Sequence, residues 1–111
     1  MNEREKLVQL QQVSQLMLDV KLLALDKAAK ARQASLDHLA ALNRPSPQTD
    51  LDPIIAGEVA MRYQNWADQR RSAINLDLAR QTADWADARS DAALAFGRNA
   101  VIGKLRGRAD P

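Results

Sequence analysis

The stretch NRPSPQTDLDP, residues 43–53, is the one substantial break in the helical pattern of this 111-residue chain. Pro45 and Pro47 lack the amide N–H that a helix needs, and each disfavours the helical conformation in the residue before it. Asp52 and Pro53 together are a helix start signal. An acid at the N-cap accepts backbone N–H groups, and a proline at the first helical position loses no hydrogen bond.

The predicted organisation is one helical hairpin over residues 1–111, with helices at 2–43 and 53–107 and a loop at 44–52. Residues 3–42 contain neither glycine nor proline and are rich in the good helix formers Ala, Leu, Gln and Lys. A short loop favours antiparallel neighbours. The predicted fold class is all-α: a rod-like, antiparallel two-helix coiled-coil hairpin whose second helix is longer than the first.

The composition limits the classes of protein to consider. Hydrophobic residues make up 46% of the chain, but only 4% are aromatic, which suits a thin helix pair with little deep burial. The absence of cysteine excludes disulfides and thiolate metal sites. No run approaches the roughly 20 apolar residues that a membrane span needs. We expect a cytoplasmic protein.

Both helices carry apolar residues at the seven-residue spacing of a coiled coil. In the first helix the predicted seam consists of Leu10, Val13, Met17, Val20, Ala24, Lys27, Ala31, Ala34 and His38. In the second helix it consists of Ile74, Leu78, Gln81, Trp85, Ala88, Ala92, Ala95, Asn99 and Ile102. The first helix has a further stripe, and so more apolar surface than one partner covers: Leu18, Leu22, Leu25, Ala29, Leu36, Leu39 and Leu42.

A tight connection between the helices predicts their register. If Leu42 lies opposite Ile54, facing residue numbers sum to about 96, and Met17 faces Ala79. The first helix is then used up when the second reaches about residue 94. The remaining C-terminal residues have no partner in the chain, so they form either a docking helix or a frayed end weakened by glycines.

Few residues are candidates for chemistry. The chain has a single histidine and no glycine-rich nucleotide-binding loop, so we predict no catalytic, cofactor or metal site and no enzyme activity. Asp84, Asp87 and Asp91 share one helical face and could hold a hard cation. The favoured reading is a solvated face, because Arg80 and Arg98 flank these acids at helical spacing.

The stretch YQNWADQRRSAIN, residues 63–75, places two aromatic residues beside two arginines on a helix. Tyr63 and Trp66 lie off the predicted seam. Three readings stay open: core packing over leucines of the first helix, stacking on single-stranded nucleic acid with Arg70 and Arg71, or a protein-docking face, for which Trp, Tyr and Arg are enriched.

The pattern Y-Q-x-W from Tyr63, with Ile74, Leu78, Trp85, Ala92 and the basic ending KLRGR, resembles the second helix of the FliJ family of flagellar export proteins and its injectisome counterparts. The family layout is a long N-terminal helix, a short break and a longer second helix with a basic, leucine-containing end. It is similar to the whole of this chain.

The resemblance implies a cytoplasmic stalk or chaperone of the type III export apparatus, serving flagellum biogenesis and protein transport. Such a protein contacts the export gate protein and inserts its paired ends into the export ATPase ring, and other export chaperones are further expected partners. It would bind no cofactor and no nucleic acid, and would reach the membrane through partners alone. The alternative is a small nucleic-acid-binding or generic adaptor hairpin.

The resemblance also implies two sets of binding residues. The gate-binding set is His38, Leu42, Tyr63, Trp66, Arg70, Ala73 and Asp77. The ATPase-binding set is Leu94, Phe96, Arg98, Val101, Ile102, Lys104, Leu105, Arg106 and Arg108. The basic residues of this second set either make an electrostatic contact with an acidic partner or simply suit the C-terminal end of a helix.

Overall fold

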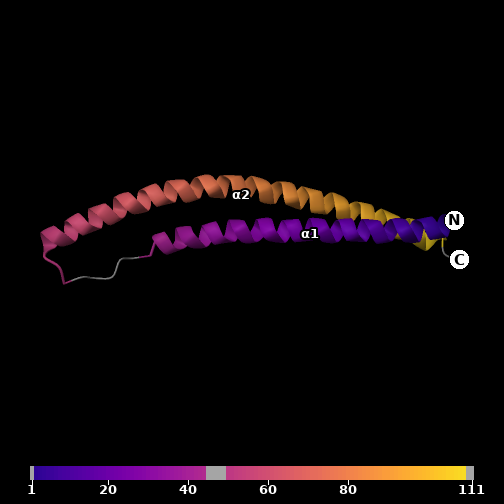
Figure 1. Cartoon of the computed structure of the whole chain (residues 1–111), viewed down its shortest axis with the longest axis horizontal. Coiled ribbons are helices and arrows are strands. Elements are labelled where there is room, and N and C mark those ends of the chain that lie inside the picture. Colours follow the sequence, from indigo (N-terminus) through magenta and orange to yellow (C-terminus); the bar gives the residue numbers. More distant parts are fainter. Residues whose placement is uncertain (1, 45–49, 110–111) are drawn as a thin grey trace. The chain divides into compact units, whose positions relative to one another are not determined.

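A computed structural model describes residues 2–44 and 50–109, and they form two helices, α1 (Glu3–Leu42) and α2 (Pro53–Ala109) (Figure 1). The helix ends lie within two residues of the predicted ones. The all-α fold class with a longer second helix is confirmed. Positions 45–49 of the predicted loop lie outside the described residues. Neither helix contains a stretch long and apolar enough to cross a membrane, as far as the described residues go.

Side-chain caps explain where both helices begin. Asn2 Oδ1 accepts a hydrogen bond from the Glu5 amide at 2.9 Å, which makes Asn2 the N-cap of α1. Asp52 Oδ1 accepts one from the Ile54 amide, also at 2.9 Å, and Pro53 takes the first helical position. The start signal in the sequence therefore acts as predicted.

The contacts divide the chain into two compact units. Unit 1 contains Met1–Lys30 and Ala83–Pro111, and unit 2 contains Ala31–Thr82. Within each unit a segment of α1 runs antiparallel to a segment of α2. In unit 1 the indigo start of α1 lies beside the yellow end of α2 (Figure 1).

α2 buries the stripe that the sequence predicts. Every predicted seam residue of α2 is buried or half-buried, with Ile74, Ala92 and Ala95 the most enclosed. The same spacing continues at both ends. The seam of α2 is Ala67, Arg71, Ile74, Leu78, Gln81, Trp85, Ala88, Ala92, Ala95, Asn99, Ile102 and Arg106.

α1 buries a different stripe from the predicted one. The predicted seam residues are exposed throughout, including His38, and Leu10, Val13, Met17 and Val20 are 48–62% exposed. Most of the further leucine stripe faces α2 instead. The seam of α1 is Leu7, Gln11, Ser14, Leu18, Lys21, Leu25, Ala28, Arg32, Ser35, Leu39 and Leu42.

Hydrogen bonds between polar side chains explain which face of α1 packs against α2. The α2 seam carries two amide side chains, and a buried amide needs a hydrogen-bond partner. Ser14 Oγ donates to Asn99 Oδ1 and Ser35 Oγ donates to Gln81 Oε1, each at 2.6 Å. Both serines are buried. On the predicted face of α1, the residues next to these serines are Val13 and Ala34, whose side chains cannot form such hydrogen bonds, so counting apolar residues selects the wrong face.

The same pairs set a register that differs from the predicted one. Ser14 lies opposite Asn99 in unit 1, and Ser35 lies opposite Gln81 in unit 2, so facing residue numbers sum to about 114 instead of about 96. The predicted register is wrong by about 18 residues. It assumed the tightest possible connection, whereas specific hydrogen bonds between the helices favour the longer offset.

The corrected register pairs the C-terminal part of α2 with the start of α1. Arg106 Nη1 donates to Gln11 Oε1 at 3.4 Å, and a Cβ at Gly103 would lie 3.2 Å from Gln11 Nε2. The prediction that this segment has no partner in the chain is therefore wrong. In this register the last residue of α1, Leu42, faces about residue 72, so the segment that extends beyond α1 is the part of α2 before that point. Within residues 53–62 only Ala56 is even half-buried.

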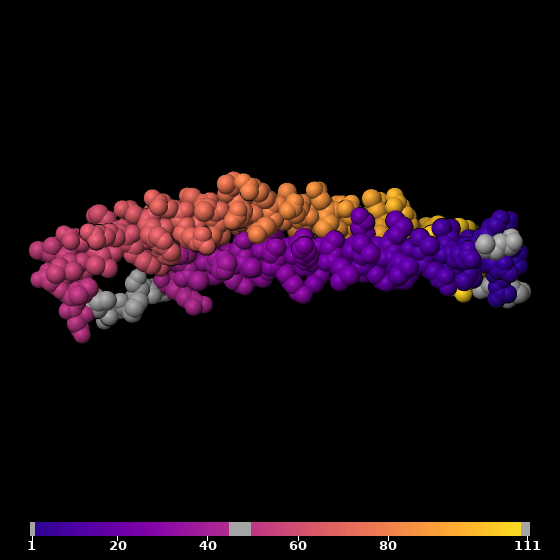
Figure 2. Space-filling view, in the orientation of Figure 1, coloured from indigo at the N-terminus to yellow at the C-terminus, as the bar shows by residue number. Residues whose placement is uncertain are grey.

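The interface between the helices is thin. Among the described residues, the buried apolar side chains are Leu18, Ala67, Ile74, Ala92 and Ala95. Figure 2 shows the helices of each unit packed directly against each other. Alanines at the seam allow such close approach. This leaves large apolar side chains elsewhere on both helices in contact with solvent.

Candidate functional site: an aromatic pocket and an apolar side

Unit 2 contains an open pocket between the end of α1 and the first half of α2. Its volume is about 370 Å³, and we call it the aromatic pocket. Its lining includes five of the seven residues of the predicted gate-binding set. The lining residues are His38, Ala41, Leu42, Tyr63, Trp66, Arg70 and Ile74. The other two predicted residues, Ala73 and Asp77, are exposed on α2 and are not part of the lining.

Two aromatic rings dominate the pocket. The centroids of Tyr63 and Trp66 lie 5.7 Å apart with the rings tilted by 42°, a favourable aromatic contact. Trp66 is 53% exposed, and Tyr63 is half-buried. The core reading therefore fails for Trp66. The indole is held against a neighbouring ring but keeps a large surface available to a ligand.

Arg71 of α2 forms hydrogen bonds with the C-terminal end of α1 beside the pocket. Its Nη2 donates to the Leu42 carbonyl oxygen at 3.3 Å, and its Nε donates to Asn43 Oδ1 at 3.1 Å. Its Nη1 lies 2.8 Å from Asp68 Oδ1. The last turn of α1 contains no basic residue, so Arg71 supplies from α2 the cation that the carbonyls at a helix C-terminus favour.

The position of Arg71 was missed by sequence reasoning, which grouped it with Arg70 as a possible phosphate-binding pair. No pattern within α2 indicates that one of two adjacent arginines faces α1. Because the Arg71 guanidinium donates to protein oxygens, it is not available as the phosphate contact of the nucleic-acid alternative. Arg70 is exposed and lines the pocket.

The predicted ATPase-binding set lies in three places on unit 1. Ile102 and Arg106 are half-buried in the seam against α1. Phe96 and Lys104 are exposed, away from the rest. The remaining members share one face of α2: Leu94, Arg98, Val101 and Leu105 each immediately precede a seam residue, and Arg108 continues the same spacing three residues after Leu105.

That face of α2 continues onto α1. An antiparallel helix pair has a local two-fold axis normal to the plane of both helices, so residues that precede the seam lie on one side of the pair in both helices. In unit 1 every such residue is exposed. We call the apolar part of this surface the apolar side: Leu10, Val13, Met17 and Val20 of α1 with Leu94, Val101 and Leu105 of α2.

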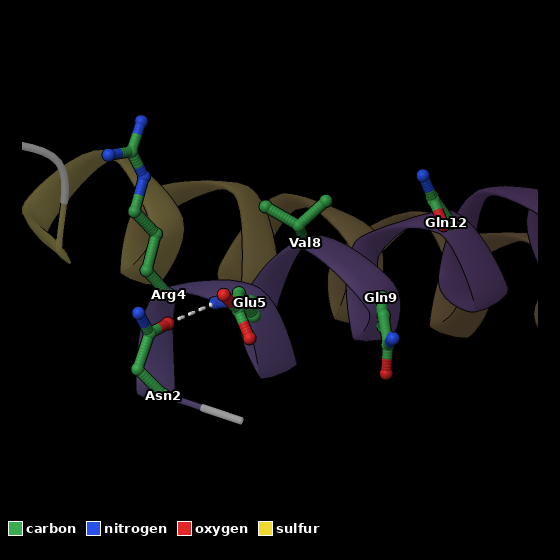
Figure 3. A pocket seen from close by; sticks show the side chains of 6 residues that line it. All are labelled: Asn2, Arg4, Glu5, Val8, Gln9 and Gln12. Carbon is green, nitrogen blue, oxygen red and sulfur yellow. Dashed lines mark hydrogen bonds between the residues drawn. The ribbon is translucent and has the colours of Figure 1, made fainter.

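A second hollow, of about 530 Å³, lies along the first turns of α1. Figure 3 shows that its side chains come from α1 and its N-cap Asn2 and point in different directions, with a hydrogen bond from the Glu5 amide to Asn2. The lining residues are Asn2, Arg4, Glu5, Val8, Gln9 and Gln12. Because the polar groups do not converge, this hollow is not a candidate site.

The acidic face of α2 shows no metal site. Asp84, Asp87 and Asp91 are exposed, and Lys21 Nζ lies 3.8 Å from Asp91 Oδ2. Within the described part of the chain, no three acidic or histidine side chains are grouped closely enough to hold an ion. These acids are thus placed as the favoured reading of a solvated face expects.

The comparisons with known proteins give no relative: no family model, curated protein or solved structure matches this chain.

Proposed function

We propose that this chain is a non-catalytic, cytoplasmic coiled-coil adaptor of a type III protein export apparatus, which binds the export gate protein and the export ATPase ring as a stalk or chaperone. The observation that carries the proposal is the aromatic pocket. Five residues that the family resemblance assigns to gate binding, from two helices far apart in sequence, line this one hollow.

The chemistry of the pocket suits a protein ligand. Trp, Tyr and Arg are the residues most enriched among those that dominate binding energy at interfaces. The rings of Tyr63 and Trp66 offer apolar surface, and Arg70 offers guanidinium donors at the rim. A partner segment with an apolar anchor and a nearby acid would therefore fit the pocket.

The ATPase contact belongs to the opposite end of α2. Arg98 and Arg108 flank the exposed leucine and valine side chains there, as rim charges flank an apolar anchor. Such charges mainly speed association with an acidic partner, whereas the apolar side chains slow dissociation.

The gate contact is tested by titrating the purified chain with the cytoplasmic domain of the gate protein in a calorimeter. Trp66→Ala should weaken binding at least about tenfold, because it removes a half-exposed anchor worth more than about 1.4 kcal/mol. Arg70→Ala should weaken it less. The matched control is Leu76→Ala, because Leu76 is 57% exposed on α2 of the same unit and does not line the pocket.

The control should bind like the unmodified chain, and circular dichroism should show all variants equally helical. The proposal is contradicted if Trp66→Ala and Leu76→Ala bind the gate domain equally well, or if the unmodified chain does not bind it at all.

A further inference from the structure

The apolar side of unit 1 is larger than a solitary helix pair normally exposes. Its residues are 44–62% exposed. Seven side chains of this size leave roughly 700 Å² of apolar surface, close to the ~800 Å² per partner that a standard interface buries. The largest patch on a typical monomer is about 300–600 Å². On α1 these residues are three and four positions apart, as in a seam between helices, and on α2 Arg98 occupies the position between Leu94 and Val101 that this spacing requires.

Charged residues at the two ends of this surface indicate which partner covers it. Along α2, this face runs from the acid Asp91 through Leu94, Arg98, Val101 and Leu105 to the base Arg108. Along α1 it runs from the acid Glu3 and the base Lys6 through the apolar residues 10–20 to the base Lys27. The outermost charges of each stripe are therefore opposite. When such a stripe meets its own antiparallel copy, Glu3 faces Lys27 and Asp91 faces Arg108.

We propose that a second copy of this chain covers the apolar side, forming a two-fold symmetric four-helix dimer in which α1 packs antiparallel on α1 and α2 antiparallel on α2. An interface of this kind must be complementary to itself. On α1 the facing pairs are Leu10 with Val20, Val13 with Met17, and Glu3 with Lys27. On α2 they are Leu94 with Leu105, Arg98 with Val101, and Asp91 with Arg108.

The two stripes independently give the same symmetry axis. The α1 pairs are centred on residue 15, and the α2 pairs are centred between residues 99 and 100. Within the chain, Asn99 Nδ2 donates to Gln15 Oε1 at 3.0 Å, so these two centres lie opposite each other. One axis therefore satisfies both stripes. A chance arrangement of apolar residues would have no reason to place the two centres side by side.

The evidence for the dimer does not depend on the proposed function, but the dimer and the ATPase contact would use some of the same residues. It covers Leu94, Val101 and Leu105, which also belong to the ATPase-binding set. The same side chains cannot serve both partners at once. Self-association therefore protects this surface when no other partner is present, and ring binding requires the dimer to separate.

The mass of the purified full-length chain tests the proposal without any other component. Sedimentation equilibrium at micromolar concentration should give twice the chain mass of 12.3 kDa. Met17→Lys should give a monomer, because it replaces an apolar side chain near the axis and adds a second cation to an interface that already contains Arg98. Leu22→Lys is the matched control: Leu22 is 47% exposed and Met17 is 48% exposed, but Leu22 follows the seam residue Lys21 and so lies on the other side.

Thiol cross-linking tests the predicted axis. The chain has no cysteine, so single-cysteine variants are unambiguous. A mixture of Leu94→Cys and Leu105→Cys chains should form a disulfide-linked dimer on mild oxidation much faster than either variant alone. A monomer at all concentrations overturns the proposal, as does equal weakening by Met17→Lys and Leu22→Lys, or equal cross-linking by the mixture and the single variants.

Discussion

Two hydrogen bonds between buried serines and seam amides determine how the helices meet. In each, a serine hydroxyl of α1 donates to an amide oxygen of α2: Ser14 to Asn99 in unit 1, and Ser35 to Gln81 in unit 2. A slip of the register would leave these groups facing apolar neighbours, which is costly for a buried polar group. The two serines therefore disfavour other registers of the two helices, which an alanine-rich seam alone would not distinguish.

At this scale we predict that Ser14→Ala lowers the free energy of unfolding by about 1 kcal/mol, because the half-buried Asn99 oxygen loses its donor. Urea denaturation followed by circular dichroism measures the change. Ser72→Ala is the control, since Ser72 is exposed on α2, and surface changes of this kind stay within about 0.5 kcal/mol. Equal stability of the two variants would show that the Ser14 hydrogen bond does not hold the register.

At the scale of the helices, α2 remains helical through three glycines from which the sequence predicts a frayed end. It passes Gly97, Gly103 and Gly107 and ends at Ala109. The corrected register explains this, because packing against α1 compensates for the weak helix propensity of glycine. Of the three glycines, Gly103 lies against α1, whereas Gly97 and Gly107 have nothing within 4 Å of an added Cβ.

Alanine substitutions test this view of α2. Gly97→Ala should stabilise the protein by about 1 kcal/mol, because helix propensity improves and nothing lies within 4 Å of the new Cβ. Gly103→Ala should gain less, because its Cβ would lie 3.2 Å from Gln11 Nε2 and force that side chain to move. Thermal unfolding measures both. A larger gain at Gly103 than at Gly97 would contradict the close approach of α2 to α1 at that point.

The two helices also differ in how much of their structure could be predicted from the sequence. The helix ends follow from local signals, such as the Asp52 cap, and depend on no tertiary contact. The seam of α2 was predictable because its spacing runs unbroken from Ile74 to Ile102, whereas the stripe that precedes it is charged from Asp77 to Asp91 and has large apolar residues only from Leu94 onward. The seam of α1 was not, because α1 has two apolar stripes and only the partner helix selects between them.

For the whole molecule, the fold class was predictable from periodicity and one break, but the register was not. The register depends on pairs such as Ser35 and Gln81, and nothing in the sequence identifies these two residues as partners. Five of the seven residues predicted to bind the gate line one pocket, because most of them lie within one short stretch of α2. The residues predicted to bind the ATPase lie in three places, because α2 pairs with α1 along that segment.

Every surface assigned to this protein depends on the register, so a direct measurement of it is the strongest test. The variant pair Ser14→Cys/Asn99→Cys should form a rapid intramolecular link with a short thiol-reactive cross-linker, because these residues face each other. Met17→Cys/Ala79→Cys, which a minimal loop would bring together, should not link within one chain. Efficient linkage of the second pair and not of the first would contradict the account and leave the C-terminal end of α2 without a partner in the chain.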